Sequence, residues 1–331
     1  MPSLPKPRLR RSARARADSA LSATPTEPSV EVVEAHGLRW LNIERPRPID
    51  RAWLEEHFDF HPLDYEDVLS RNQRPKIDEY DDYLFIVLYF PVFDKTVGRL
   101  NAAELDIFIG PDFLITLPNE PIPPVEYLFE RCRSNDEVRD QLFSKGSGYL
   151  LYKIVDDSFD YCFPMLRKIG NKLERLEEDI FEGRSEEVVR DISNSKQEII
   201  NFRKIIRPER IVLSDLERTK QRYLAEDLEV YFDDIVDASE RIWDMLENYK
   251  EVVEALEVTN ESVISHRVNE VLRVLTAISV VVLPLTFIAS IWGMNVHVPG
   301  QGETAPFWAI IGGMTLLLLG MVAYFRKRGW L

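Results

Sequence analysis

The chain has 331 residues, of which 45% are hydrophobic and 29% charged, so a wholly disordered, collagenous or low-complexity protein is excluded. The formal net charge of −15 argues against nucleic acid as a partner. Two cysteines, Cys132 and Cys162, are too few for a disulfide framework or a cysteine zinc site, and they favour a reducing compartment.

The first 29 residues form a basic segment rich in Pro, Ser and Ala. Its basic residues before position 20 are Lys6, Arg8, Arg10, Arg11, Arg14 and Arg16. No apolar stretch follows them, so this is not a secretory signal. We predict a disordered cytoplasmic tail over 1–29, and an organelle transit peptide or a contact with anionic lipid stays open.

Residues 30–147 show the pattern of a cytoplasmic α/β domain. Strands are expected, in chain order, at 30–33, 38–43, 83–90, 105–109 and 113–117. Turn residues at His36–Gly37 and Gly110–Asp112 join the first two and the last two of them. Asp50 is expected to cap a helix over 52–58, and Pro91 is expected to end the third strand.

From residue 148 onward glycine becomes rare and apolar residues recur at spacings of three and four, which predicts helices. Residues 148–230 are expected to form a helical hairpin region that Pro208 breaks. A stalk helix over 231–273 is expected to continue into the segment that follows. A helix of about 60 residues is not stable alone, and copies of itself are the obvious partners.

Two uncharged runs, Val274–Trp292 and Phe307–Phe325, would each span about 28 Å as helices, which matches the hydrocarbon core of a bilayer. The connecting loop, 293–306, has no Lys or Arg, whereas the tail over 326–331 is basic. The positive-inside rule therefore places both termini in the cytoplasm.

Two stripes follow the long helix at helical spacing. The acidic stripe consists of Asp233, Asp237, Glu240, Asp244, Glu247, Glu251, Glu254, Glu257 and Glu261. The polar membrane stripe consists of Asn269, Leu272, Thr276, Ser279, Leu283, Thr286 and Ser290. At helical periodicity the seven residues of the second stripe share an arc of about 100°. A solvated face and close helix packing are the simpler interpretations of the two stripes.

An acidic vestibule leading into a weakly polar pore explains both stripes at once. Glu254, Glu257 and Glu261 would form the vestibule and attract cations. Leu272 and Leu283, repeated around an axis, would form hydrophobic constrictions. Two spans cannot enclose a pore, so several copies are required. We find no glycine-rich phosphate loop, so no ATP site is indicated.

The first span ends in Gly293-Met294-Asn295, preceded by Pro284–Ala289, and the N-terminal domain contains His61–Leu69 and Arg74–Ile77. With these motifs the chain resembles the CorA family of magnesium/cobalt transporters over roughly residues 30–331. The resemblance implies a funnel-shaped homopentamer with an α+β cytoplasmic domain, a long helical stalk and two C-terminal transmembrane helices.

The resemblance also implies roles for particular residues. Gly293, Met294 and Asn295 would form the selectivity filter, and the polar membrane stripe would line the pore. Glu66 and Asp67 match acidic residues that bind regulatory Mg²⁺ between subunits. The stalk partner of that site is expected near position 258, where Val258 stands, so the adjacent Glu257 is the candidate.

These features predict a channel that moves hydrated Mg²⁺ inward across a bacterial inner membrane, closed by intracellular Mg²⁺. Co²⁺ and Ni²⁺ are further candidate ions. His297 in the outer loop could favour a softer ion, so a zinc transporter on the same fold, driven by protons, is an alternative. A non-conducting membrane scaffold is a third, and no catalytic constellation indicates an enzyme.

Overall fold

The computed structural model describes residues 27–70, 73–94, 99–182, 185–219, 228–294 and 304–330. These residues form two compact units. The first contains the described chain up to Lys172 together with Asn194–Glu251, and the second contains Leu173–Ser193 and the chain from Val252 onward. Nearly all of the predicted basic tail lies outside the described residues.

The first unit is built on a six-stranded mixed sheet in the order β1-β2-β6-β5-β4-β3. The strands are β1 (Glu31–Ala35), β2 (Leu38–Asn42), β3 (Lys76–Glu79), β4 (Leu84–Asp94), β5 (Arg99–Ile109) and β6 (Phe113–Pro118). Both predicted turns are confirmed: His36 and Gly37 adopt positive φ angles of 53° and 78°, and the Gly110 N–H donates to the Phe113 carbonyl over 3.0 Å. Strand β3 has no counterpart among the predicted elements.

The prediction that Pro91 ends the third strand was wrong, because β4 continues to Asp94. Pro91 lies opposite Ala102 of β5, while β3 pairs with β4 only as far as Val87. Beyond Val87, no described strand lies along the other side of β4. A missing N–H is tolerated on such an edge.

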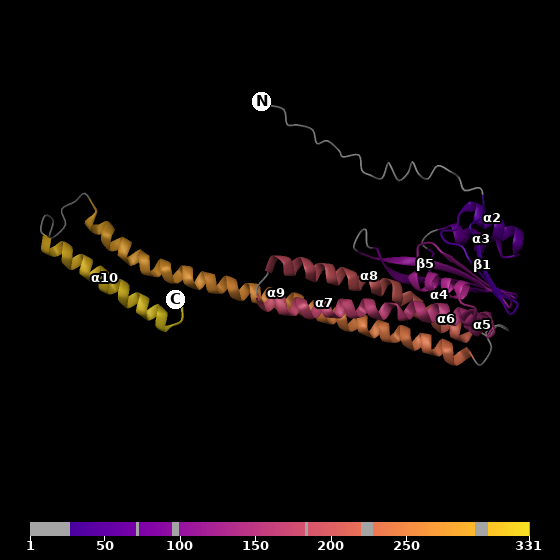
Figure 1. Ribbon diagram of the computed structural model, residues 1–331. Helices are drawn as coiled ribbons and strands as arrows, with labels where there is room; N and C mark the ends of the chain where they lie inside the picture. The colour runs from indigo at the N-terminus through magenta and orange to yellow at the C-terminus, as the bar shows by residue number, and fades with distance from the viewer. Residues whose placement is uncertain are drawn as a thin grey trace, which may run out of the picture. The chain divides into compact units, whose positions relative to one another are not determined.

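Helices cover both faces of the sheet (Figure 1). They are α2 (Pro48–His57), α3 (Pro62–Leu69), α4 (Pro123–Ser134), α5 (Asp136–Phe143) and α6 (Ser147–Asp160). Trp40 of β2 meets Phe129 of α4 edge-on at 5.0 Å, and Phe90 of β4 meets Phe159 of α6 at 5.6 Å. The opposite face of the sheet packs against α2 and α3.

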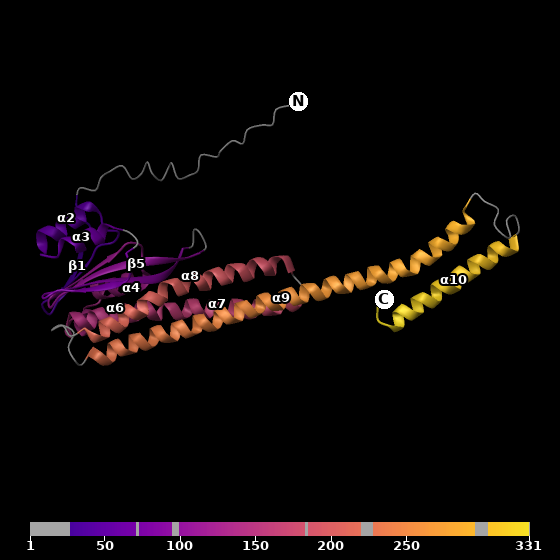
Figure 2. The ribbon, with the colours of Figure 1, turned by 180° about the vertical axis from the view of Figure 1, so that it is seen from behind.

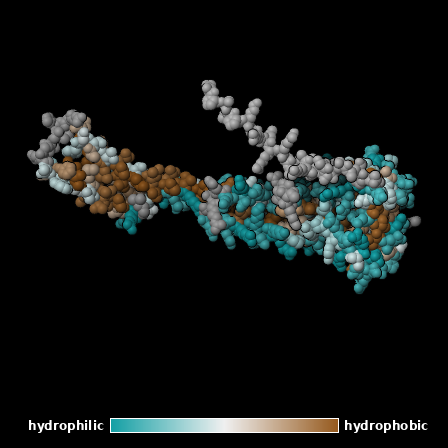
Figure 3. Space-filling view, turned by 45° about the horizontal axis from the view of Figure 1, so that its top comes forward, coloured by the Kyte–Doolittle hydropathy of each residue, from teal (hydrophilic) through white to brown (hydrophobic). Residues whose placement is uncertain are grey.

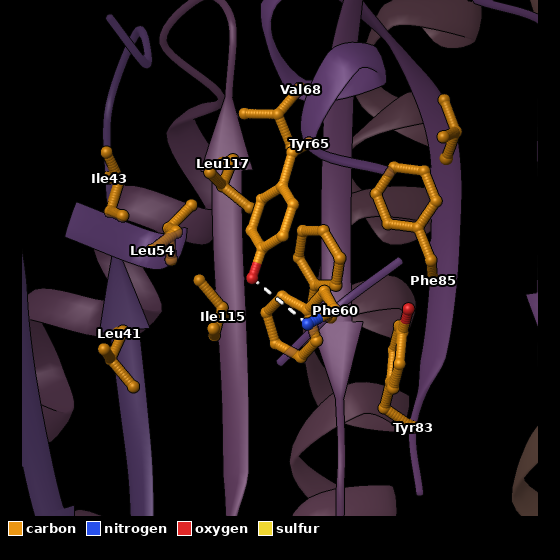
Figure 4. Packing of buried hydrophobic residues seen from close by; sticks show 12 residues of the cluster. Leu41, Ile43, Leu54, Phe60, Tyr65, Val68, Tyr83, Phe85, Ile115 and Leu117 are labelled. Atoms are coloured by element: carbon orange, nitrogen blue, oxygen red, sulfur yellow. Dashed lines mark hydrogen bonds between the residues drawn. The ribbon is translucent and has the colours of Figure 1, made fainter. Parts of the chain in front are cut away.

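The core beneath α2 and α3 is aromatic (Figure 4). Phe60 stacks on Phe108 with ring centroids 4.2 Å apart. The Tyr65 hydroxyl accepts the Phe60 N–H over 3.1 Å and donates to the Phe58 carbonyl over 2.6 Å. Because its polar end is satisfied, Tyr65 can be buried, and it fixes α3 against the sheet.

Three long helices follow: α7 (Cys162–Glu182), α8 (Ser185–Arg218) and α9 (Glu229–Trp292). The prediction that Pro208 breaks a helical hairpin was wrong, since Pro208 lies inside α8. Ile206 and Glu209 beside it are fully buried. Tertiary packing on both sides of the proline therefore holds the helix together despite the missing N–H.

Helix α9 confirms the continuous helix expected from the stalk region through the first span. In the first unit it is fixed to α8 by two ion pairs, Arg203 with Glu247 and Arg210 with Glu240. Both guanidinium groups also lie 5.1 Å from the ring of Trp243, which they flank. These contacts set the register of α8 against α9.

In the second unit, the membrane part of α9 packs against α10 (Thr304–Lys327), as seen from opposite sides in Figures 1 and 2. Ala277 and Val281 of α9 contact Phe325 of α10, with Met321 beside them. Both helices are long and apolar enough to cross a membrane. Apolar side chains cover this part of the molecule in the view of Figure 3.

The start of α2 depends on Asp50, which acts from the third position of the helix because α2 begins at Pro48. Its fully buried carboxylate accepts the backbone N–H of Ser29 over 2.7 Å and that of Arg47 over 2.9 Å. It also forms an ion pair with the Arg47 guanidinium at 2.8 Å. Burial raises the pKa of Asp50, but these hydrogen bonds outweigh burial and leave the pKa below its ordinary value.

Asp50→Ala should lower the free energy of unfolding by about 2–3 kcal/mol at neutral pH. Removing one partner of a fully buried ion pair costs about 3–5 kcal/mol, and Arg47 is only partly buried. The measurement is thermal unfolding of the purified full chain, with Glu55→Ala, which removes an exposed pair with Arg51, as the control. Because the folded pKa is depressed, the contribution is complete above about pH 4 and lost as pH falls through the folded value. A difference that persists at pH 2 would contradict this assignment.

Candidate ion pathway

All seven residues of the polar membrane stripe are exposed on α9 in the single chain. The buried residues of the same helix segment, Ala277 and Val281, project about 150° away from the centre of the stripe. Helix α10 therefore covers the face of α9 opposite the stripe. Within the described part of the chain, the polar membrane stripe is uncovered, so it is available to contact water or other chains.

The hydroxyl groups of the stripe are oriented by the helix that carries them. Thr276, Ser279 and Thr286 donate to the carbonyl oxygens four residues earlier, over 2.7, 2.9 and 2.9 Å. Their protons are thus used within the helix, and each oxygen presents lone pairs outward. Such a surface accepts hydrogen bonds, which suits the waters around a hydrated cation.

Two leucines interrupt the hydroxyls of the stripe. The exposed fractions of Leu272 and Leu283 are 52% and 66%, which is high for leucine outside a lipid or protein contact. Leu283 directly precedes Pro284, the one proline inside α9. If several copies of the chain surround an axis, each of these leucine positions would form an apolar ring that narrows the polar pathway.

The nine residues of the acidic stripe lie in different surroundings along α9. Glu240 and Glu247 are paired with arginines of α8, so they serve the contact between these two helices. Glu254 and Glu261, farther along α9, are exposed, and Glu257 is half-buried. The role of these three residues as a vestibule stays a prediction.

The end of α9 carries the predicted filter. The Gly293 N–H donates to the Ala289 carbonyl over 3.0 Å and closes the last helical turn, and Met294 follows with 56% of its surface exposed. Asn295 and His297 lie outside the described residues. The role of Asn295 therefore stays a prediction.

The candidate regulatory residues Glu66 and Asp67 lie on α3. Asp64, in the first turn of the same helix, holds α3 in place. The buried Asp64 carboxylate accepts hydrogen bonds from Tyr80 and Tyr83, over 3.0 and 2.8 Å. This holds α3 so that Glu66 is exposed and Asp67 is half-buried.

Asp67 is already paired. It accepts from Lys76 over 2.8 Å and from the Gln73 amide over 3.0 Å, and Lys76 also bonds to Asp78. Burial lowers the pKa of Lys76, but its two carboxylate partners outweigh burial and raise the pKa to about 12. At neutral pH a fixed ammonium group therefore occupies one side of Asp67.

Among the described residues, no three His, Cys, Asp or Glu side chains come together in a metal-binding arrangement. Glu66 and Asp67 belong to the first unit, and Glu257 belongs to the second. The regulatory Mg²⁺ site expected at α3 stays a prediction.

Sequence reasoning missed buried carboxyl groups near this region, among them Asp106 and Glu209. Asp106 of β5 is 3% exposed and Glu209 of α8 is fully buried, and burial raises the pKa of each well above its ordinary value. Glu209 accepts the Tyr89 N–H of β4 over 2.8 Å, at the edge where β3 has ended. An acid inside an apolar strand, as at Leu105-Asp106-Ile107, was the available signal.

Comparison with known proteins shows the family. Residues 35–327 match the family described as CorA-like Mg²⁺ transporter protein. The chain is 32% identical over 296 residues to the cobalt/magnesium transport protein CorA of Thermotoga maritima, covering 88% of this chain and 83% of the relative. It is 23% identical over 300 residues to the divalent cation transporter CmaX of Pseudomonas aeruginosa, covering 88% and 87%.

The fold agrees with these relationships. The complete structure of the CorA magnesium transporter from Methanocaldococcus jannaschii superposes with a TM-score of 0.77 at 22% identity, covering 93% of this chain and 95% of that one. The chain belongs to the CorA-like Mg²⁺ transporter family. It is accordingly a divalent-cation transporter of the membrane and not an enzyme.

The exposed stripe predicts which side of α9 meets water in the assembled protein. Cysteines placed at Ser279 and Thr286 should react with a charged, membrane-impermeant thiol reagent, because their oxygens lie on the exposed polar face. Ala277→Cys is the matched control, since that position is fully buried against α10. The native Cys132 and Cys162 are both buried and should contribute little background. Equal labelling at positions 277 and 279 would contradict a water-facing stripe.

Proposed function

We propose that five copies of this chain surround a central pathway lined by the polar membrane stripe, and that hydrated Mg²⁺ passes through it. The observation that carries this proposal is the placement of the stripe. Hydroxyl acceptors occupy the face of α9 opposite α10, in a segment apolar enough to lie in a membrane. Copies related by a closed rotation would bring these faces together around one axis.

The chemistry of the stripe fits a hard, hydrated ion. It contains hydroxyls and an amide but no carboxylate, so it can accept hydrogen bonds from bound waters without holding the ion too tightly to release it. The acidic residues Glu254, Glu257 and Glu261 would raise the local concentration of cations below the pathway. The name of the Thermotoga relative supports Mg²⁺ and Co²⁺ as cargo, and Ni²⁺ belongs to the same proposal.

The membrane potential would set the direction of ion transport. A divalent ion gains about 4.6 kcal/mol per 100 mV on moving inward, twice the value for a unit charge. This supports passive uptake across a bacterial inner membrane with both termini in the cytoplasm, as the distribution of basic residues indicates.

Regulation would act at α3. Mg²⁺ bound at Glu66 and Asp67, with Glu257 as the candidate stalk ligand, would bridge neighbouring subunits and hold the pathway closed. Loss of intracellular Mg²⁺ would leave carboxylates facing one another and loosen the ring. The pairing of Asp67 with Lys76 adds a competitor, because Mg²⁺ would have to displace the ammonium group from that carboxylate.

Asn295→Ala should abolish selective Mg²⁺ uptake while leaving the oligomer intact, because the proposed filter depends on its amide oxygen. Uptake of Mg²⁺ into proteoliposomes measures the effect, and size-exclusion chromatography checks assembly. His297→Ala, two residues away, is the matched control and should retain Mg²⁺ uptake. Undiminished transport by the Asn295 variant would remove it from the filter.

Asp67→Asn and Lys76→Met should shift closure by Mg²⁺ in opposite directions. The first removes a charged ligand and should raise the Mg²⁺ concentration for half-maximal protection from protease by about tenfold, equivalent to about 1.4 kcal/mol. The second removes the competing ammonium and should lower that concentration. Asp112→Asn, which breaks an exposed pair with Arg39, should leave the midpoint unchanged. Coincident midpoints for all variants would exclude α3 as the sensor.

The proton-coupled zinc transporter is distinguished by its driving force. It would require Zn²⁺ uptake that depends on a proton gradient, and His297→Ala should then weaken it. A non-conducting scaffold would show no uptake of either ion. The polar stripe opposite α10 favours conduction over a scaffold, and its lack of a carboxylate argues against a proton relay within the spans.

A further inference from the structure

The C-terminal end of α10 is held in a specific cap. The Trp330 N–H donates to the Phe325 carbonyl over 3.0 Å, and the Gly329 N–H donates to the Arg326 carbonyl over 3.2 Å. Gly329 adopts a φ of 68°, which favours glycine at this position. The chain folds back so that the Trp330 and Phe325 rings lie 5.6 Å apart. Aromatic side chains are thereby fixed at the C-terminal end of the second span.

Beside this cap, an apolar groove of about 430 Å³ lies between α9 and α10. Val280 lines it from α9, and Leu316, Gly320, Met321 and Tyr324 line it from α10. Except for the Tyr324 phenol, these lining side chains are apolar. A Cβ added at Gly320 would meet no heavy atom within 4 Å, so the groove is open there.

The groove leads to a positive end of the helix. Arg326, Lys327 and Arg328 are exposed directly after it. The Arg328 guanidinium lies 5.7 Å from the ring of Tyr324, which also lines the groove. Tyr324 therefore contacts both the apolar groove and a cationic side chain.

We propose that this groove binds an anionic phospholipid, with an acyl chain along Gly320 and the phosphate at Arg326 and Arg328. The groove lies in a segment apolar enough for the bilayer (Figure 3), where acyl chains are the abundant apolar ligand. The adjacent positive charges select an anionic headgroup over a zwitterionic one. They also repel the divalent cargo.

The bound lipid has a structural consequence for the first span. The groove adjoins the contact of Ala277 and Val281 with Phe325, the contact that directs the polar stripe away from α10. A lipid that fills the groove would stabilise this contact by packing against it from the membrane.

The test is native mass spectrometry of the full chain released from nanodiscs with equal amounts of phosphatidylglycerol and phosphatidylcholine. The wild type should retain phosphatidylglycerol at least about fivefold over phosphatidylcholine. Gly320→Leu should lose the retained lipid because the added side chain fills the groove. Gly312→Leu is the matched control, since it makes the same change in open space on α10 away from the groove.

Arg326→Gln combined with Arg328→Gln should retain lipid but lose the preference for phosphatidylglycerol. This variant carries the test alone if Gly320→Leu does not fold. Equal phosphatidylglycerol retention by the Gly320 and Gly312 variants, or an unchanged preference in the arginine variant, would overturn the proposal. Disulfide-linked dimers of Gly320→Cys would also overturn it, because the groove would then be covered by a second copy.

Discussion

The contact of Ala277 and Val281 with Phe325 is the constraint on which the membrane part of the chain depends. It occupies the face of α9 that α10 covers, and it leaves the hydroxyl stripe exposed on the opposite face. Those hydroxyl oxygens are poor partners for lipid tails, since a polar group in hydrocarbon loses its hydrogen bonds to water. Water or another polar stripe would be a better partner for their free lone pairs, and the proposed ring of identical chains would supply both. The proposals of several copies and of a hydroxyl-lined pathway both rest on this packing.

A second constraint acts on the cytoplasmic part of the same helix. α9 runs without interruption from Glu229 to Trp292. Two arginine–glutamate ion pairs on either side of Trp243 hold it against α8. A continuous helix transmits rotation and translation along its axis. A movement of α9 at these ion pairs would therefore also move the polar membrane stripe. Glu240 and Glu247 of the acidic stripe take part in this contact between the two helices.

The sequence was informative where a pattern depends only on local geometry. The uncharged spans, the turns at His36–Gly37 and Gly110–Asp112, and the long unbroken helix needed no knowledge of neighbours. Pro91 and Pro208 were misjudged because strand edges and buried helix faces, which decide whether a missing N–H matters, are tertiary properties. The pairing of Lys76 with Asp67 was invisible for the same reason, since it joins a helix to a strand. The residues of the stripe could be predicted, whereas the covered face opposite them required the position of α10.

Uptake of divalent ions into proteoliposomes that contain the purified full chain tests the central claim most directly. Mg²⁺ and Zn²⁺ are compared at a fixed membrane potential, with and without a proton gradient. A pathway lined by hydroxyls and driven by voltage predicts Mg²⁺ uptake that rises with the potential and is indifferent to the proton gradient. Zn²⁺ uptake that requires the proton gradient, or no flux of either ion, would contradict it.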